Sequence, residues 1–396
     1  MSWIKAKLSV VAPARPLKVA PLNDADLVWQ LNLDQIEADS GRLLECIKQP
    51  YSKAGSSTHW FDERYVLYSK LRPYLNKVLL PHQRGLGTTE LVPLLPDPEK
   101  LDRKYLAFYL RSKQFVEWVS LRTAGAKMPR VSMQLFWEHE IPLPPLAEQK
   151  KIAAILDGAY SLRQKDQQLV VRYTALSQSL FLEMFGDPVT NPMGWPEARL
   201  ADLTTFENGD RSSNYPSGND IKDNGVLFLS TKNITESKLD LDIVQFISEE
   251  KFRSLSRGKA KKGDLLITLR GSLGNCCIFD CEYSSAFINA QMMIIRTKNQ
   301  ISNLFLHSLI TNRQFNSMLQ VIGRGAAVQQ LTATQLANLY VMTPPFDKQT
   351  LFAERIQLIE VQKQQVQRSL EKSESLFDSL LQNAFTGELT SKGGVN

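Results

Sequence analysis

The chain repeats itself at an offset of 200 residues, and each copy ends in a long polar segment without proline. The repeated positions include Pro144 and Pro344, Gln149 and Gln349, Gln164 and Gln364, Leu176 and Leu376, and Phe185 and Phe385. Solenoid repeats are only about 20–50 residues long, so this period indicates a duplicated globular domain followed by a helix. Because most other positions differ between the copies, the repeat predicts one molecule that recognises two different things.

Composition sets the limits for this architecture. The 396 residues are 43% hydrophobic, which is enough for two cores at roughly 150 residues per domain. The net charge of +6 is compatible with a phosphate-rich partner but does not require one. The four cysteines have neither disulfide-framework nor zinc-site spacing, so we expect reduced, mostly buried thiols and no metal site. The absence of an apolar run of about 18 residues and of a cleavage signal predicts a cytoplasmic protein.

Both halves have the patterns of mixed α/β domains. Residues 65–71, 226–229 and 265–269 are short apolar runs that predict strands. Residues 104–118 and 303–319 are equivalent in the two copies and carry apolar side chains at a period of 3.6, which predicts one helix in each copy.

Two long helices follow from the segments 146–185 and 346–385, each ~60 Å long at 1.5 Å per residue. Each has a narrow apolar stripe, which one helix cannot bury alone, so we expect the two to form an antiparallel coiled coil between the domains. The alternative is that each helix packs separately on its own domain. The predicted stripe contains Ile152, Leu156, Ala159, Val170, Tyr173, Leu176 and Leu180 in the first helix, and Phe352, Ile356, Ile359, Val366, Leu370, Leu376 and Leu380 in the second.

The sequence therefore predicts a pseudo-two-fold α/β (α+β) protein in four parts. We expect a first recognition domain at 1–145, a first spacer helix at 146–186, a second recognition domain at 187–345, and a second spacer helix with a tail at 346–390.

Catalytic motifs are missing from the sequence. Neither a phosphate-binding P-loop nor a glycine-rich dinucleotide loop occurs. The segment 343–346, Thr-Pro-Pro-Phe, is superficially similar to the tetrapeptide with which adenine amino-methyltransferases contact the target base. However, its repeat mate has Leu143 in place of Thr343, and two prolines before a helix are explained by a rigid helix entry. A degenerate methyltransferase using Thr343 remains an alternative.

Basic and amide side chains concentrate in predicted turns at matching places in both copies. Such side chains can satisfy base edges or phosphates, and neighbouring aromatic rings can stack or pack on sugars. The candidate nucleic-acid-binding residues are Lys70, Arg72, Tyr74, Lys77, Lys127 and Arg130 in the first half, and Arg211, Asn214, Tyr215, Lys232, Asn233, Arg270, Asn275, Arg324 and Gln329 in the second.

Together these features resemble the specificity subunit of type I restriction-modification enzymes, over nearly the whole chain. The resemblance rests on the Pro-Pro-x3-Gln helix entries that start at Pro144 and Pro344, and on residues 31–34, 69–77, 263–271 and 385–389. It implies two target-recognition domains, each recognising one half of a bipartite double-stranded DNA sequence, held apart by the paired helices. The first helix departs from the pattern, because it ends in Phe-Gly-Asp at 185–187 where the second copy has Phe-Thr-Gly-Glu-Leu.

The resemblance also implies a role in defence against foreign DNA. The partners would be methyltransferase subunits, expected to be two, which carry S-adenosylmethionine and methylate adenine N6, together with restriction (translocase-nuclease) subunits. The chain itself is expected to be non-catalytic and to bind no cofactor. A coiled-coil scaffold that binds only protein is the other alternative, and it would have no salt-sensitive affinity for DNA.

Overall fold

The computed structural model describes residues 3–19, 22–235, 237–325 and 329–391, and it divides into two compact units. Unit 1 comprises Met1–Gln168 and Gln367–Asn396, and unit 2 comprises Leu169–Val366. Both boundaries fall inside the long helices α5 (Leu146–Phe185) and α11 (Phe346–Asn383). Each unit therefore contains one mixed α/β domain, the first half of one long helix and the second half of the other.

Unit 1 builds its sheets mainly from strands that precede its helices. The sheets have the strand orders β3-β2-β7-β4, β6-β5-β8, β1-β11 and β10-β9. Their strands are β1 (Ile4–Lys7), β2 (Leu27–Leu31), β3 (Lys48–Pro50), β4 (Thr58–Phe61), β5 (Val66–Ser69), β6 (Val78–Leu79), β7 (Gly85–Thr88), β8 (Leu91–Leu94), β9 (Thr123–Ala124), β10 (Arg130–Val131) and β11 (Glu140–Leu143). The helices are α1 (Leu8–Val11), α2 (Arg103–Arg111), α3 (Lys113–Ser120), α4 (Met133–Glu138) and the start of α5.

Unit 2 has two larger sheets, of the orders β13-β23-β20-β21 and β14-β18-β15-β22-β19, and the pairs β12-β24 and β16-β17. Its strands are β12 (Glu197–Arg199), β13 (Thr204–Asn208), β14 (Ile221–Lys222), β15 (Val226–Leu229), β16 (Ile234–Thr235), β17 (Lys238–Leu239), β18 (Gln245–Ile247), β19 (Lys259–Lys261), β20 (Leu265–Thr268), β21 (Cys276–Ile278), β22 (Ser285–Ile288), β23 (Met292–Thr297) and β24 (Tyr340–Met342). The helices of unit 2 are α6 (Leu200–Leu203), α7 (Glu249–Ser254), α8 (Asn303–Thr311), α9 (Arg313–Ile322), α10 (Ala333–Ala337) and the start of α11, while α12 (Glu388–Ser391) follows α11 in unit 1.

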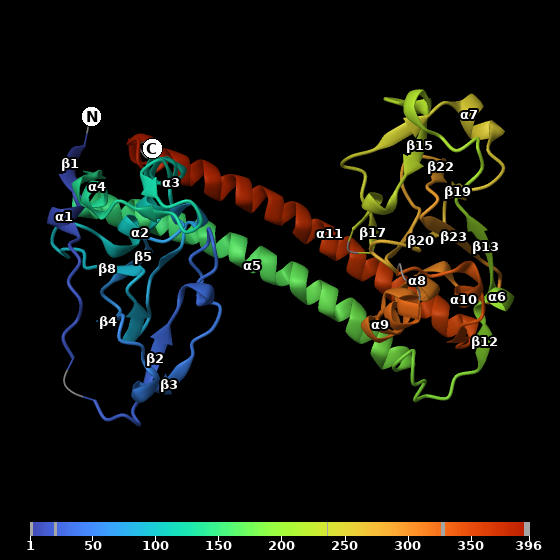
Figure 1. Cartoon of the computed structure of the whole chain (residues 1–396), viewed down its shortest axis with the longest axis horizontal. Coiled ribbons are helices and arrows are strands. Elements are labelled where there is room, and N and C mark those ends of the chain that lie inside the picture. Colours follow the sequence, from blue (N-terminus) through green and yellow to red (C-terminus); the bar gives the residue numbers. More distant parts are fainter. Residues whose placement is uncertain (1–2, 20–21, 236, 326–328, 392–396) are drawn as a thin grey trace, which may run out of the picture. The chain divides into compact units, whose positions relative to one another are not determined.

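The repeat in the sequence is a repeat of structure. Helices α2, α3, α4 and α5 of the first copy correspond in order to α8, α9, α10 and α11 of the second, and each pair begins 200 residues apart. Figure 1 shows α2, α3 and α4 gathered around the first turns of α5 in unit 1. The same core positions are filled in both copies, since Phe115 and Phe315 are both buried and lie at equivalent places. The fold class predicted from the sequence is thus confirmed.

One prediction about these helices is wrong. The apolar period predicted a single helix over 104–118 and another over 303–319, but each is two helices separated at one residue. Ser112 has extended backbone angles and its side chain accepts a hydrogen bond from the Phe115 N–H, so it caps α3. Asn312 caps α9 in the same way through the Gln314 N–H. A capping side chain competes with the helix backbone, and the period of apolar residues does not detect it.

The long helices pack against each other as an antiparallel pair within each unit. In unit 1, Tyr160 of α5 contacts Phe377 of α11 with ring centroids 5.8 Å apart, and Ser369 donates a hydrogen bond to Asp166 at 3.1 Å. Higher residue numbers on one helix therefore meet lower numbers on the other. In unit 2, Phe352 packs on Phe181 near the opposite ends of the same helices, with centroids 5.7 Å apart.

Each core also receives the end of the helix that began in the other unit. Phe385, just after α11, packs edge-on against Tyr105 and Tyr109 in the core of unit 1, with centroids 5.3 and 5.1 Å away. Phe185, at the end of α5, packs on Phe305 of unit 2 at 4.9 Å. The alternative that each helix packs only on its own domain is therefore wrong. Phenylalanine is repeated at 185 and 385 because each ring packs into the core of the unit in which its helix ends.

The predicted apolar stripe is correct near the helix ends and wrong at two positions. Ile152, Leu156 and Ala159 are buried in unit 1, as are Phe352 and Ile356 in unit 2, while Leu180, Ile359 and Leu380 pack partly buried against the same cores. Val170, Tyr173, Val366 and Leu370 are half-buried. Leu176 and Leu376 are 48% and 46% exposed, so the expectation that they pack is corrected. The larger rings of Phe181, five residues after Leu176, and of Phe377, the residue after Leu376, contribute the buried surface instead.

Candidate nucleic-acid interface

Two segments that are far apart in the sequence meet beside strand β5 in unit 1. The turn that follows β5, residues 70–77, lies against the loop at 123–130 that connects β9 and β10. Leu71 and Arg130 form an antiparallel bridge, and the Arg72 N–H donates a hydrogen bond to the Pro129 carbonyl at 2.7 Å. The loop carries the exposed Lys127, so these contacts bring the basic residues of both segments to one place.

Unit 2 repeats this arrangement beside β20. Arg270 and Gln330 form the antiparallel bridge that Leu71 and Arg130 form in unit 1, and the Leu331 N–H donates to the Leu269 carbonyl at 2.9 Å. The Arg270 side chain also donates to the side-chain oxygen of Gln330 at 2.8 Å. The architecture of the site is therefore the same in both halves, while the side chains that it presents differ. Residues 326–328 of its loop lie outside the described part of the chain.

The bridges also align the two turns residue by residue. Because Leu71 is equivalent to Arg270, the residue equivalent to Arg72 is Gly271, and the two arginines occupy neighbouring rather than equivalent positions. Gly271 and Arg72 both have left-handed backbone angles, with φ of 79° and 48°. Glycine adopts this conformation freely, whereas a long side chain is rarely found there and is held by its surroundings. An exposed arginine kept at such a position is consistent with a contact to a partner.

An acidic residue that the sequence did not point to orders the turn and the loop of unit 1. Glu90 accepts hydrogen bonds from the Arg130 guanidinium at 2.9–3.1 Å, and its carbonyl accepts the Lys70 N–H at 3.0 Å. It lies 40 residues from Arg130 in the sequence, so no local pattern joins the two. Arg130 is exposed and the ion pair is screened by solvent, so this arginine can exchange Glu90 for a phosphate at low free-energy cost.

The remaining candidates divide by exposure. The exposed ones are Arg72, Tyr74, Lys127, Arg130, Arg211, Lys232, Arg270, Arg324 and Gln329, and the half-buried ones are Lys70, Lys77, Asn214, Tyr215 and Asn275. Arg211 lies in the loop before β14 and donates to the Ala290 carbonyl at 3.0 Å, one residue before Gln291, whose carbonyl accepts the Leu269 N–H at 2.8 Å. The structure thus gathers Lys70, Arg72, Lys127 and Arg130 in unit 1, and places Arg270 next to the loop of Arg324 and Gln329 in unit 2.

Three of the candidate residues make hydrogen bonds or ring contacts within the fold. Asn233 is buried, and its side-chain amide donates to the carbonyls of Asp240 and Ile243 at 3.1 and 2.9 Å. Lys77 donates to the Leu33 carbonyl at 2.7 Å. The Tyr215 ring packs against Phe228, and burial raises the pKa of its hydroxyl. These side chains are occupied within the fold, which residue type alone could not reveal.

The Pro-Pro helix entries have a structural role in both copies. Gln149 is fully buried; its side-chain oxygen accepts the Asp102 N–H, and its amide donates to the carbonyls of Lys100 and Pro144, each at 2.8 Å. Gln349 makes the equivalent bonds, to the Ser302 N–H at 2.8 Å and to the carbonyls of Gln300 and Pro344 at 3.4 and 2.8 Å. The repeated glutamine therefore joins the helix entry to the turn before α2 or α8.

The Thr343 hydroxyl is engaged as well. It donates to the Pro196 carbonyl at 2.9 Å, and the Thr343 N–H donates to the same oxygen at 2.7 Å.

Over the described residues no cluster of histidine, cysteine, aspartate and glutamate could hold a metal ion, and no helix is long and apolar enough to cross a membrane. Cys276 and Cys277 are buried, and burial raises the pKa of both thiols, that of Cys277 to about 12, so neither is a ready nucleophile.

Comparison with known proteins places this geometry in context. The family model described as "Type I restriction modification DNA specificity domain" matches residues 84–169 and 192–370. The specificity subunit of the type I restriction enzyme EcoBI from Escherichia coli is 23% identical over 321 residues, which are 74% of this chain and 67% of that protein. The MjaVIII specificity subunit from Methanocaldococcus jannaschii is 22% identical over 331 residues, 78% of this chain and 76% of that protein.

A solved structure shares the fold over almost its whole length. The S subunit of a type I restriction-modification system from M. genitalium superimposes with a TM-score of 0.64 and 15% identity, covering 97% of this chain and 96% of that one.

Proposed function

The chain belongs to the type I restriction-modification DNA specificity family, and we propose that it recognises a bipartite double-stranded DNA target, one half-site with each unit. The observation that carries this proposal is the repeated site, in which a turn after β5 or β20 meets the loop after α3 or α9. The same backbone arrangement with different side chains suits two half-sites of different sequence. Phosphate contacts would position each unit, and contacts to base edges would specify the sequence.

In this proposal, partner subunits and not this chain catalyse the methylation and cleavage of DNA. The chain would dock adenine-N6 methyltransferase subunits, expected to be two because the frame is duplicated, and restriction subunits would join for cleavage. S-adenosylmethionine would bind to the methyltransferase subunits and not to this chain. The partner would flip an adenine next to each half-site out of the duplex for methylation. We place the complex in the cytoplasm, where it would meet foreign DNA.

A comparison of methylated adenines tests the proposed function directly. Genomic DNA would be mapped for N6-methyladenine in cells that contain the methyltransferase subunits with and without this chain. We expect a bipartite motif, with two specific parts separated by unspecified bases, to be methylated only when the chain is present. Methylation of the same motif in its absence would contradict the proposal.

Replacing Arg72 or Arg270 with alanine is expected to weaken DNA binding at one half-site each. A contact to a guanine edge would cost ~1–3 kcal/mol and relax the specificity at one position, whereas a phosphate contact would weaken all sequences alike and reduce the salt dependence. Fluorescence anisotropy with the full chain and DNA altered in one half-site at a time measures both effects. Arg313→Ala, an exposed position on α9, is the matched control. Unchanged affinity in both arginine variants would remove these turns from the interface.

Thr343→Ala is expected to leave methylation by the assembled complex nearly unchanged. The variant removes one hydrogen bond to the Pro196 carbonyl, which keeps the bond from the Thr343 N–H, so the loss of stability is about 1 kcal/mol. Initial rates of methyl transfer to target DNA measure the effect. A loss of activity by several orders of magnitude would support the degenerate methyltransferase instead.

A further inference from the structure

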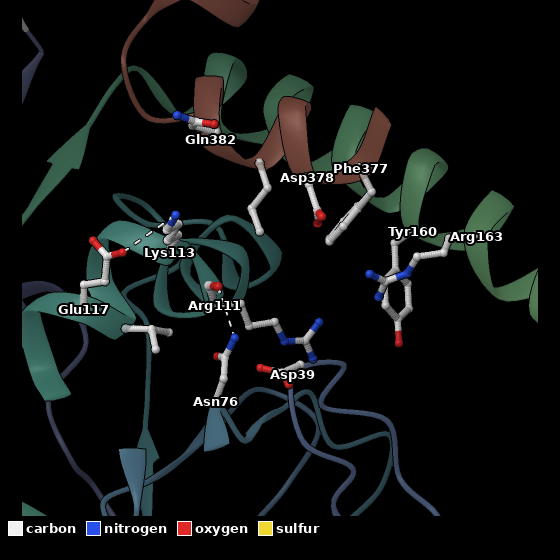
Figure 2. A pocket seen from close by; sticks show the side chains of 12 residues that line it. Asp39, Asn76, Arg111, Lys113, Glu117, Tyr160, Arg163, Phe377, Asp378 and Gln382 are labelled. Atoms are coloured by element: carbon white, nitrogen blue, oxygen red, sulfur yellow. Dashed lines mark hydrogen bonds and ion pairs between the residues drawn. The ribbon is translucent and has the colours of Figure 1, made fainter. Parts of the chain in front are cut away.

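A cavity of about 510 Å³ lies in unit 1 where the end of α2 and the start of α3 face the two long helices (Figure 2). This volume is in the range of small-molecule sites, which is ~300–1,000 Å³. Its lining includes Asn76, Arg111, Tyr160, Arg163, Phe377 and Asp378.

Two guanidinium groups face this cavity without enough partners. Arg111 donates one hydrogen bond to the Val78 carbonyl at 2.6 Å, but its Nε is buried and unpartnered, and the Nε of Arg163 is buried and unpartnered as well. Figure 2 shows them extending toward one another from α2 and α5. They lie 5.9 and 5.1 Å from the ring of Tyr160. Burial lowers the pKa of Arg111 to about 10, and the charge of Arg163 contributes to the decrease.

The carboxylates of the cavity do not neutralise these arginines. Glu117 pairs with Lys113 at 3.9 Å. Asp39 and Asp378 also line the cavity, but among the described residues neither forms an ion pair with a basic side chain. The charge of Arg163 also acts on Glu37, but that carboxylate already pairs with Arg42 at 2.8 Å. Half-buried cations without a full counter-charge are costly, so the site favours a ligand that supplies negative charge.

The described residues of unit 2 share the frame but replace three side chains of this site, while Lys363 stands at the position equivalent to Arg163. The residues equivalent to Arg111, Tyr160 and Phe377 are Thr311, Glu360 and Ser177. The Thr311 hydroxyl donates to the His307 carbonyl at 2.8 Å, and Glu360 pairs with Lys238 at 2.9 Å. The cavity is therefore not part of the arrangement that both halves use, and it points to a separate role of unit 1.

We propose that the cavity binds a small phosphate-bearing molecule, with Arg111 and Arg163 donating to the phosphate oxygens. Planar guanidinium groups pair with phosphate through parallel hydrogen bonds, and the several oxygens of a phosphate can accept from both arginines at once. Phe377, which already packs under the Arg163 guanidinium at 4.5 Å, provides an apolar wall for the remainder of the ligand. This proposal is independent of DNA recognition.

Isothermal titration of the full chain with inorganic phosphate, at constant ionic strength, tests the site. We expect saturable binding that Arg163→Gln weakens by about tenfold or more and that Arg163→Lys partly restores. Lys165→Gln removes the same charge from an exposed position of the same helix and should bind like the natural chain. Asp378→Asn should bind more tightly, because it removes a repelling charge, and a damaged fold could not produce that gain.

The absence of saturable binding would overturn the proposal, as would equal weakening by Arg163→Gln and Lys165→Gln. DNA affinity of the same variants separates the two sources of phosphate. Unchanged DNA affinity in Arg163→Gln supports a small-molecule site, whereas a parallel loss of DNA and phosphate binding would assign the arginines to the DNA backbone and refute it. Phosphate binding without any DNA binding would instead contradict the proposed function alone.

Discussion

Gln149→Leu is expected to lower the free energy of unfolding of unit 1 by about 3–5 kcal/mol. The substitution keeps the volume but removes three hydrogen bonds to buried or partly buried backbone groups, and each buried group left without a partner costs about 1–3 kcal/mol. Urea denaturation of the full chain, followed by tryptophan fluorescence and circular dichroism, measures the change. Gln349→Leu should have a similar effect on unit 2, slightly smaller because one of its bonds is 3.4 Å long.

Gln168→Leu is the matched control, since Gln168 lies on the same helix and is exposed. We expect a change within ~0.5 kcal/mol for this variant. If Gln149→Leu changed the free energy of unfolding as little as Gln168→Leu, the hydrogen bonds of Gln149 at the helix entry would not stabilise the unit.

Lengthening both long helices together is expected to change the spacer of the DNA target and leave its two half-sites unaltered. Four residues, about one helical turn, would be duplicated in α5 between Gln168 and Leu169 and in α11 between Val366 and Gln367, where the units divide. Each insertion adds ~6 Å of helix, and base pairs rise ~3.4 Å, so the unspecified spacer should lengthen by about one or two base pairs. Mapping of methylated motifs in cells measures this change.

An insertion in one helix alone serves as a control. It would put contacts at one end of the helix pair, such as Tyr160 with Phe377, out of register with those at the other, such as Phe181 with Phe352, so we expect lower stability rather than a new spacer. The same residues inserted in the exposed turn at Asp223 and Asn224 should leave the spacer as it is. If the paired insertion altered the recognised bases while the spacer stayed the same, the helices would not set the spacing.

Local sequence was sufficient for much of this fold. The offset of 200 residues predicted the duplication, because equivalent core positions such as Phe115 and Phe315 must be filled in both copies. The absence of proline together with the apolar stripe predicted α5 and α11 almost to the residue. These features depend on neighbours three or four positions apart, so a single sequence contains them. The turns carrying Arg72 and Arg270 were predicted for the same reason.

Contacts between distant segments were decided only by the tertiary structure. Glu90 and Arg130 lie 40 residues apart, and no pattern predicts that they meet or that the side chains of Lys77 and Asn233 donate to backbone carbonyls within the fold. Arg111 and Arg163 lie on different helices, and the cavity between them exists because the long helices pack on the end of α2. Residue type and spacing determine which elements form, whereas burial and the choice of hydrogen-bond partner depend on which surfaces come together, and those surfaces are remote in the chain.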